Sequence, residues 1–260
     1  MASRQAPQPD LNDRDGLEET ITVDLRPGIW EGRGCVRLSV LIPVFNEEAT
    51  VAQVVTRVMA TGLVQEIILV DDGSSDGTPE ILFSLIEGPG GPARLLRHER
   101  NLGKGAAIRT GLAAVTGDVV LIQDADLEYD PADYPALLAP FSDPAVQVVY
   151  GSRNLRRNPR STWAFYLGGR FLSWMVNSLH RSSLTDEATG YKVLRTSVLR
   201  EMDVQAPGFA FCPELTSKLL RKGITIHEVP ISYRPRSREE GKKITWSDGV
   251  AAIWTLLKHR

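Results

Sequence analysis

Cysteine is scarce in this sequence: Cys35 and Cys212 are the only two among 260 residues. Two cysteines cannot build a disulfide framework, and such a low number is typical of a reducing compartment. Long apolar runs are also absent. The most apolar segment, 163–179, carries Arg170 in its middle and falls short of the roughly 18 uncharged residues of a membrane span. The first 20 residues are polar and lack the apolar core of a secretory signal. We therefore expect a cytoplasmic protein without a membrane-spanning helix.

Proline and glycine are not enriched either, with 16 and 22 residues. This content is near the usual background and excludes a fibrous or low-complexity chain. Hydrophobic residues make up 42% of the sequence and charged residues 24%. A chain of this length and composition can bury the core of one large domain or of two small ones.

The net charge is only −2, but the two signs are unevenly distributed. Residues 1–150 contain 11 Lys and Arg against 23 Asp and Glu, whereas residues 151–260 contain 19 against 9. Within 151–181 there are six arginines and no acid. This polarity predicts that the second half binds an anion. The alternative, in which solvated faces merely happen to segregate, stays open.

Strand-like and helix-like segments alternate along most of the chain. Residues 1–36 are polar without apolar periodicity and are expected to form a flexible extension, so regular structure should start at Arg37. The alternation predicts an α/β fold in which helices flank a mostly parallel sheet, with 37–260 as a single domain. The expected strands are 38–43, 66–70, 93–97, 118–123, 146–150 and 191–194, with an extended pair over 224–233 broken at Pro230. The expected helices cover 47–61, a segment opening at Asp76, 104–115, 163–179, 213–222 and 245–259.

Acidic residues follow the predicted strands at the edge where parallel sheets bind ligands. Asp124 and Asp126 leave an apolar strand at positions i and i+2, so both carboxylates can point to the same side. A divalent cation would relieve their repulsion, and oxygen ligands of this kind suit Mg²⁺ or Mn²⁺. Glu128 could supply a third ligand. The alternative is a capped loop before Pro131, since Asp and Pro also initiate turns.

Two further loops carry chemistry at the same edge. In the segment 70–78, Asp72 can accept hydrogen bonds from the N–H groups of a nucleotide base, although a glycine-rich turn with a helix cap explains the rest of that segment. In the segment 101–105, Lys104 stands at a helix start, where a phosphate can bind. A capped helix start is the alternative for this loop.

Several motifs occur in the order seen in family 2 glycosyltransferases, and the sequence resembles that family over residues 37–260. The last three motifs look like the branch containing dolichol-phosphate mannose synthases. The motifs are Ile42-Pro43-Val44-Phe45-Asn46-Glu47, Val70-Asp71-Asp72-Gly73-Ser74-Ser75-Asp76-Gly77-Thr78, Asn101-Leu102-Gly103-Lys104-Gly105, Asp124-Ala125-Asp126-Leu127-Glu128, Gly151-Ser152-Arg153, Asp186 with Thr189-Gly190-Tyr191-Lys192, Glu228-Val229-Pro230-Ile231 and Gly241-Lys242-Lys243-Ile244.

The resemblance implies the nucleotide-sugar-binding fold called GT-A, with a nucleotide-sugar-binding half over 37–150 and an acceptor-binding half over 151–260. It implies that a metal held by the segment 124–126 binds the diphosphate, and that Asp124, Asp126 and Arg153 are the catalytic residues. Glu128 falls where many relatives have Gln, which adds a negative charge. The positions that match the surroundings of base and ribose are Pro43, Phe45, Glu47, Val70 and Asp72; those that match the diphosphate segment are Asp124, Ala125 and Asp126.

The resemblance also implies cations around the phosphates and the acceptor. Arg153 matches a basic residue near the transferred sugar and the acceptor. Arg236 and Lys243 match an Arg and a Lys on a mobile loop that contacts phosphates. The loop 235–241 is about one residue longer here than in the mannose synthases, so Lys242 is the alternative to Lys243.

The charge pattern favours a phosphate acceptor. A sugar hydroxyl needs a general base, whereas a lipid phosphate is already ionised near neutral pH and needs cations beside it. The arginines of 151–181 supply such cations. No convincing base motif occurs in the second half, since Glu214 is better explained as an acid in the first turn of a helix.

Aromatic residues stand beside the basic run, in the segment 163–175. Aromatic rings together with arginines fit a helix that lies at a membrane interface, and Trp246, Trp254 and Lys258 of the final helix could extend that surface. The alternative is an aromatic stripe that packs on the sheet. The expected location is the cytoplasm, with peripheral association at the inner face of the membrane, and a separate membrane-anchoring subunit is a further candidate partner.

These observations predict an inverting, metal-dependent transferase that moves a hexose from a nucleotide sugar to a polyprenyl or dolichyl phosphate. GDP-mannose is the favoured donor and UDP-glucose the alternative; nucleic acid is not an expected partner. Three alternative functions stay open. Transfer to a sugar hydroxyl would need a carboxylate in the acceptor pocket. A nucleotidyltransferase would need a glycine-rich loop after the first strand, which this sequence lacks, and the third alternative is a non-catalytic binding module. A processive polysaccharide synthase is disfavoured because the Gln-x-x-Arg-Trp motif is missing.

Overall fold

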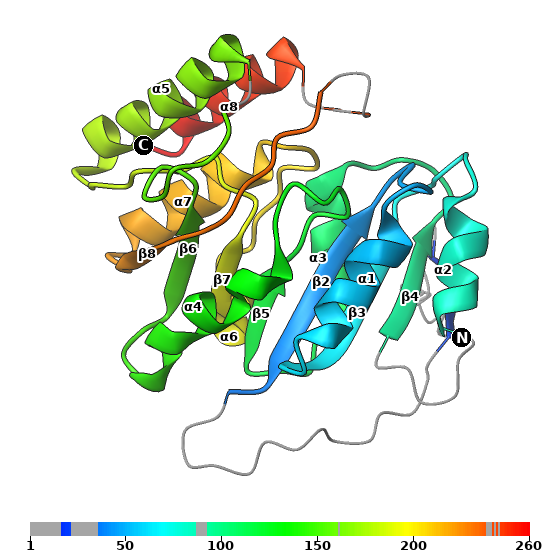
Figure 1. The fold of residues 1–260 in the computed structure, drawn as a ribbon. Coiled ribbons are helices and arrows are strands. Elements are labelled where there is room, and N and C mark those ends of the chain that lie inside the picture. Colours follow the sequence, from blue (N-terminus) through cyan, green and yellow to red (C-terminus); the bar gives the residue numbers. More distant parts are fainter. Residues whose placement is uncertain are drawn as a thin grey trace, which may run out of the picture.

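An eight-stranded sheet organises the part of the chain described by the computed structural model, namely residues 17–21, 36–86, 93–160, 162–237, 241, 243 and 245–260. The strands are β1 (Leu17–Ile21), β2 (Leu38–Val44), β3 (Val64–Asp71), β4 (Ala93–His98), β5 (Val119–Ile122), β6 (Val148–Ser152), β7 (Lys192–Arg195) and β8 (Ile226–Pro230). Their order across the sheet is β1-β4-β3-β2-β5-β7-β6-β8 (Figure 1).

Six of the eight strands run in the same direction. The pairs β2–β3, β2–β5, β3–β4 and β6–β8 are parallel, while β7 is antiparallel to both of its neighbours and β1 is antiparallel to β4. The carboxyl ends of β2, β3, β5 and β6 therefore meet at one edge, together with the start of β7. This edge is where an α/β sheet of this kind binds ligands.

Helices cover both faces of the sheet. One core cluster joins the sheet to α1, α2 and α4, and a second joins its other face to α3, α6 and α7. The central strands are buried on both sides, which explains why 38–44 reads as a nearly continuous apolar run. The helices are α1 (Val51–Ala60), α2 (Thr78–Ile86), α3 (Lys104–Ala114), α4 (Tyr134–Leu138), α5 (Trp163–His180), α6 (Thr196–Glu201), α7 (Phe211–Arg221) and α8 (Trp246–Lys258), with short 3₁₀ turns at Pro131–Asp133 and Ala139–Ser142.

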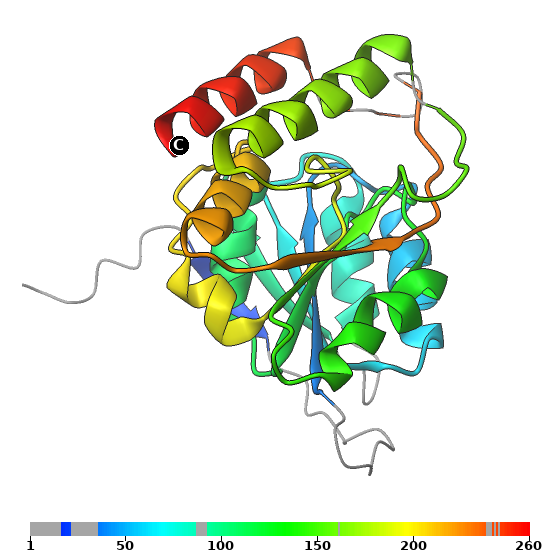
Figure 2. The ribbon, with the colours of Figure 1, turned by 90° about the vertical axis from the view of Figure 1, so that its left-hand side faces the viewer.

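Helices α5 and α8 lie side by side above the carboxyl edge instead of on a face of the sheet (Figures 1 and 2). They pack on each other and on α7 through a small cluster formed by Val176, Leu184 and Leu256. In the described part of the chain, none of the helices is long and apolar enough to cross a membrane. The pair therefore forms a roof over the edge where the predicted site residues lie.

Most predicted elements are confirmed, and four expectations need correction. Regular structure does not start at Arg37, because Leu17–Ile21 form the edge strand β1; residues 1–16 and 22–35 of the predicted extension, including Cys35, lie outside the described residues. The predicted pair over 224–233 is the single strand β8, followed by an isolated bridge between Tyr129 and Tyr233. The short helices α4 and α6 were not predicted at all.

The fourth correction concerns the start of α1, which begins at Val51 and not at Glu47. Asn46 adopts a positive φ of 50°, which turns the chain before the helix. The Thr50 hydroxyl lies 2.7 Å from the carbonyl oxygen of Ala125, which holds this turn against the predicted metal segment. Residues 45–50 thus form a loop over the sheet edge.

Gly111 allows α3 to lie close to the sheet. A Cβ at this position would lie 2.9 Å from Leu41 Cδ1 and 3.0 Å from Val70 Cγ2, and both neighbours are fully buried. Gly168, in the middle of α5, is a matched contrast because a Cβ there would meet nothing within 4 Å.

We expect Gly111→Ala to destabilise the protein by about 1–2 kcal/mol, because overpacking outweighs the gain in helix propensity. Gly168→Ala should instead stabilise it by up to about 1 kcal/mol. Thermal unfolding of the two variants beside the wild type measures both effects, at roughly 2–4 °C per kcal/mol. Equal melting temperatures for the two variants would contradict the close approach of α3.

Candidate active site

A cavity of about 940 Å³ opens at the carboxyl ends of β2, β3 and β5 beneath α5 and α8. Its floor comes from the loops that follow the strands, and its roof from residues of both helices, among them Phe171 and Trp246. Most of the predicted site residues line it: Pro43, Phe45, Glu47, Asp72, Lys104, Asp124, Ala125, Asp126, Glu128, Arg153, Arg236 and Lys243. Val70 does not, because its side chain packs in the core beside α3.

Asp124 and Asp126 face the same cavity, as their i, i+2 spacing predicts. Asp124 is paired with the ammonium group of Lys104, which stands in the first turn of α3. Burial opposes a charge on Lys104, but the neighbouring Asp124 carboxylate raises its pKa above the usual value. The carboxylate and the lysine, predicted from separate motifs, thus form one ion pair.

Asp126 lies in a strongly acidic environment. Burial and the negative charges of Asp124 and Glu128 raise the pKa of Asp126 to about 7, although the Arg236 guanidinium works against this shift. Arg236 Nη2 lies 3.3 Å from the Asp126 carboxylate. Burial and the two neighbouring carboxylates thus outweigh the effect of Arg236 on Asp126.

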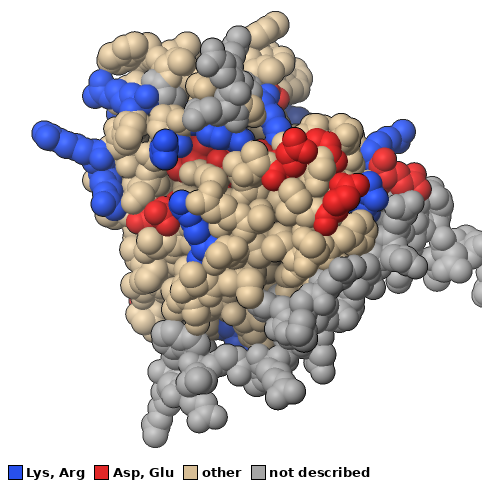
Figure 3. All heavy atoms as spheres, turned by 45° about the vertical axis from the view of Figure 1, so that its right-hand side comes forward, with Lys and Arg blue, Asp and Glu red and all other residues tan. Residues whose placement is uncertain are grey.

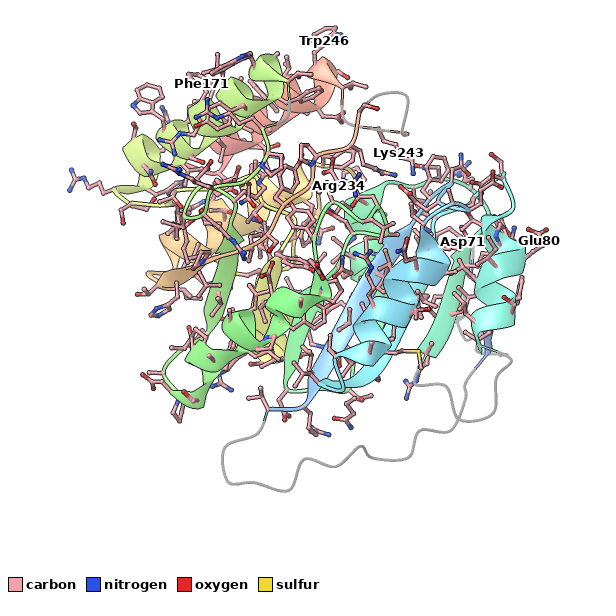
Figure 4. All side chains as sticks on the ribbon, in the orientation of Figure 1. Asp71, Glu80, Phe171, Arg234, Lys243 and Trp246 are labelled. Carbon is pink, nitrogen blue, oxygen red and sulfur yellow. The ribbon has the colours of Figure 1, made fainter. Side chains whose placement is uncertain are left out.

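Glu47 holds Arg236 and Lys243, two basic residues of the segment 236–243. Its carboxylate accepts hydrogen bonds from Arg236 Nη1 at 2.9 Å and Nη2 at 2.8 Å, and from Lys243 Nζ at 2.7 Å. Lys243 also donates to the backbone carbonyl oxygens of Phe45 and Asn46. Figure 4 shows Lys243 over the loop that follows β2, and Lys242 lies outside the described residues.

Glu128 accepts hydrogen bonds from Tyr233 and from Arg236. Its carboxylate accepts from the Tyr233 hydroxyl at 3.0 Å and from the Arg236 backbone N–H at 2.7 Å. Its role as a third metal ligand stays a prediction. Among the residues that the structure describes, no group of three or more His, Cys, Asp or Glu side chains is arranged to hold a metal ion.

The residues at the sheet edge nevertheless fit a divalent cation. Asp124 and Asp126 supply two hard oxygen ligands in one cavity. Mg²⁺ typically binds through one or two carboxylates and takes its other ligands from phosphates and water. Two protein carboxylates are therefore enough for this kind of site.

Arg153 is fixed in the wall of the same cavity. Its Nε and Nη2 donate to the two oxygens of Asp186, each at 2.7 Å, and its guanidinium lies 5.0 Å from the centre of the Tyr233 ring. Glu228 in turn accepts the backbone N–H groups of Thr185 and Asp186. Asp186 and Glu228, both from quoted motifs, thus hold Arg153 in place.

Sequence reasoning missed two features of the cavity wall. Gly190 leaves room for the metal segment, since a Cβ at this position would overlap Asp124 Oδ2 and the Tyr129 ring. Glu187 also lines the cavity, although it is fully buried, and burial raises the pKa of its carboxyl. The quoted motif skips Glu187, and no local pattern distinguishes it from a helix or loop acid.

Acidic and basic side chains also mix on the surface around this edge. Figure 3 shows both colours next to one another over the upper part of the molecule, whereas the lower part of that face is mostly uncharged. Basic residues of the second half are paired there with acids of the first half, Arg236 with Glu47 and Asp126, and Lys243 with Glu47.

Comparison with known proteins places this site in a family context. The model of the family described as Glycosyl transferase family 2 matches residues 39–203, more than half of the chain. Two curated relatives are undecaprenyl-phosphate 4-deoxy-4-formamido-L-arabinose transferases. The protein from Edwardsiella ictaluri (strain 93-146) is 30% identical over 209 residues, and that from Enterobacter sp. (strain 638) is 31% identical over 210. Each match covers 79% of this chain, but the chain spans only 62% of the relative's length.

Solved structures match a larger share of this chain than the curated relatives do. Glucosyl-3-phosphoglycerate synthase from Mycobacterium tuberculosis, in complex with Mn²⁺, UDP and glucosyl-3-phosphoglycerate, is 26% identical with a TM-score of 0.67, covering 86% of this chain and 80% of that one. The same enzyme with Mn²⁺, UDP-glucose and phosphoglyceric acid is 25% identical with a TM-score of 0.68, covering 91% and 86%. The predicted GT-A fold is confirmed.

The acidic cluster predicts a pH-dependent stability. A carboxyl whose pKa is raised by folding stabilises the folded state fully at low pH, and this contribution is lost as the pH rises through its folded pKa. For Asp126 the loss begins above 3.8 and is complete above about 7. Asn cannot ionise, so Asp126→Asn should stabilise the ligand-free protein by roughly 1–2 kcal/mol at pH 8, and by less at pH 5.

Thermal unfolding from pH 5 to 8 in the presence of a chelator measures this difference. Asp130→Asn is the matched control, because Asp130 accepts only a local turn hydrogen bond from Ala132 and Asn replaces it well. A wild type more stable than Asp126→Asn at pH 8 would show that Arg236 outweighs the carboxylate repulsion.

Proposed function

Because the chain belongs to glycosyl transferase family 2, we propose that it transfers a sugar from a nucleoside diphosphate sugar to a polyprenyl phosphate, with Mg²⁺ or Mn²⁺ as cofactor. The observation that carries this proposal is the mixed lining of one cavity. Two metal-type carboxylates, Asp124 and Asp126, lie there with the four cations Lys104, Arg153, Arg236 and Lys243. Such a site suits two phosphorylated substrates held side by side.

The cations of the site are paired with carboxylates, and the phosphates of the substrates could take the place of these carboxylates. Lys104 binds Asp124, and Arg236 bridges Glu47 and Asp126. A bound metal would use the carboxylates of Asp124 and Asp126, which would leave Lys104 and Arg236 available for diphosphate oxygens. The metal itself, when bound, would supply positive charge to the leaving diphosphate.

Arg153 supports an anionic acceptor. Its contacts with Asp186 and Tyr233 preorganise the guanidinium at the cavity, so little side-chain freedom is lost when it binds a phosphate. Glu214 is not placed as a base, because its two oxygens accept the backbone N–H groups of Gln205 and Ala206 and an ion pair from Lys218. An ionised lipid phosphate needs no base, in line with this arrangement.

A sugar hydroxyl is the second candidate acceptor, and Glu187 is the observation that favours it. Its carboxyl lines the cavity, and Oε2 has no hydrogen-bond partner there. Lys192, which is also fully buried, donates to the Glu187 backbone carbonyl oxygen at 2.7 Å and lowers the cost of a charge on this residue. Glu187 can therefore be explained as the counter-charge of the buried Lys192, without a role in catalysis.

The two curated relatives support a polyprenyl phosphate acceptor, since both are named as undecaprenyl-phosphate transferases. Their sugar is a 4-deoxy-4-formamido-L-arabinose, whereas the sequence favours a hexose, with mannose preferred. The sugar stays a prediction for this chain.

The outer face of the roof suits a membrane surface. Large apolar side chains are exposed on both helices, and Arg160 lies over the rings of Trp163 and Tyr166 at 5.3 and 5.1 Å. Figure 4 shows Phe171 and Trp246 on the upper side of the molecule. Aromatic rings with arginines on one face are typical of interfacial helices, and a lipid acceptor would be reached from this side. The exposed residues are Trp163, Leu167, Phe171 and Trp174 of α5, and Trp246, Val250, Trp254 and Leu257 of α8.

Transfer can be tested with labelled nucleotide sugars and a short polyprenyl phosphate. We expect product formation that requires Mn²⁺ or Mg²⁺, and a fall in kcat of at least about 100-fold in Asp124→Asn, because the leaving diphosphate loses its metal. Asp130→Asn is the control for an acid near the site. Product formed only with sugar hydroxyl acceptors, or full activity in Asp124→Asn, would refute the proposed reaction.

The membrane surface can be tested separately from the chemistry. Trp174 and Trp254 are 62% and 68% exposed and do not line the cavity, so replacing both with Ser should leave transfer to a short, water-soluble acceptor unchanged. Binding to vesicles that contain anionic lipids should fall roughly tenfold, because the apolar anchors are lost. Phe83→Ser, on the remote helix α2, serves as the control in the vesicle sedimentation assay. Unchanged sedimentation of the double variant would contradict a membrane-facing roof.

A further inference from the structure

We infer that the donor nucleotide carries uracil rather than guanine, and that His98 sets this preference by occupying one oxygen of Asp72. This inference rests on the proposed nucleotide-sugar site and names its base. Asp72, Pro43 and Phe45 line the cavity from the ends of the neighbouring strands β3 and β2, whereas Arg153 follows β6, on the other side of β5 and β7. A ring, a proline and a carboxylate in a phosphate-binding cavity are suited to a planar heterocycle.

Three protein donors already bind the Asp72 carboxylate. Oδ1 accepts from His98 Nδ1 at 2.7 Å and from the Leu102 N–H at 2.9 Å, and Oδ2 accepts from the Gly103 N–H at 2.8 Å. An ionised carboxylate offers about four acceptor positions, two on each oxygen. Oδ1 is therefore saturated, and a single acceptor position remains, on Oδ2.

Nucleotide bases differ in what they would offer to that position. The Watson–Crick edge of guanine presents two adjacent donors, N1–H and N2–H, which a carboxylate satisfies only with both oxygens free. Uracil presents one donor, N3–H, between two carbonyl oxygens. Cytosine and adenine place an acceptor nitrogen at the corresponding position, which the carboxylate repels. One remaining acceptor matches uracil, and guanine would leave a buried donor unpaired.

The arrangement that saturates Oδ1 is rigid. His98 is 3% exposed, and with its Nδ1 proton directed to the carboxylate, Nε2 accepts from the Thr110 hydroxyl at 2.9 Å. Gly103 adopts a φ of 94° and donates its N–H to Asp72. Gly73, which follows Asp72, lies so close to the backbone of Arg100 that a Cβ at this position would overlap it. Asp72 cannot free a second oxygen without breaking these contacts.

Calorimetry of the full chain with UDP, GDP and CDP, each with Mn²⁺, tests this inference without any transfer step. We expect UDP to bind at least about tenfold more tightly than GDP or CDP, since one unpaired buried donor weakens binding by roughly 5- to 100-fold. GDP binding as tight as UDP binding would overturn the uracil assignment while leaving the proposed function in place. No binding of any nucleotide would overturn both.

Two further measurements test the hydrogen bond between the base and Asp72, and the effect of His98 on the preference between bases. N3-methyl-UDP lacks the donor, so its affinity for the wild type should fall at least about tenfold; equal affinity would show that Asp72 does not bind the base. His98→Leu frees one position on Oδ1 and should lower the ratio of UDP to GDP affinity by at least about threefold. Thr110→Val leaves the His98–Asp72 hydrogen bond in place and should keep the ratio. An unchanged ratio in folded His98→Leu would refute the role of His98.

Discussion

Negative charge crowded at the ends of parallel strands is the constraint on which the rest of this site depends. Asp124, Asp126 and Glu128 follow one strand, and Glu47 follows its neighbour. Together they attract the cations that line the cavity, and Arg236 alone contacts Glu47, Asp126 and, through its backbone, Glu128. In the free protein these acids are paired with its own basic side chains. The same basic side chains suit the phosphates of the proposed substrates.

Strand direction decides which residues can join this cluster. Because β7 is antiparallel to β5, the residues that precede it lie beside the residues that follow β5. Gly190 consequently lies against Asp124, and its missing side chain leaves the carboxylate its room. Asp186, a few residues earlier, reaches Arg153 at the end of β6. One reversed strand therefore brings the motif around Asp186 and Gly190 to the carboxylates that follow β5.

Sequence reasoning predicted the parts of the molecule that local chemistry specifies. Apolar runs buried on both faces identified the central strands, and the acids after them identified the sheet edge. The strand β1 has no apolar run, and α4 and α6 are too short for a clear helical period. The link between Glu47 and Arg236 spans 189 residues, and the saturation of Asp72 depends on backbone N–H groups. No motif encodes either of these, since both arise only from tertiary structure.

The partners of these ion pairs are synthesised in a fixed order along the chain. During synthesis Glu47 leaves the ribosome before all four site cations, and Lys104 is the only one of the four made before Asp124, Asp126 and Glu128. Arg153 follows, and Arg236 and Lys243 are made later still. Until then the nascent sheet carries Asp126 and Glu47 without their partner Arg236. A ribosome that stalls before residue 236 would therefore leave an intermediate with an open, strongly acidic edge.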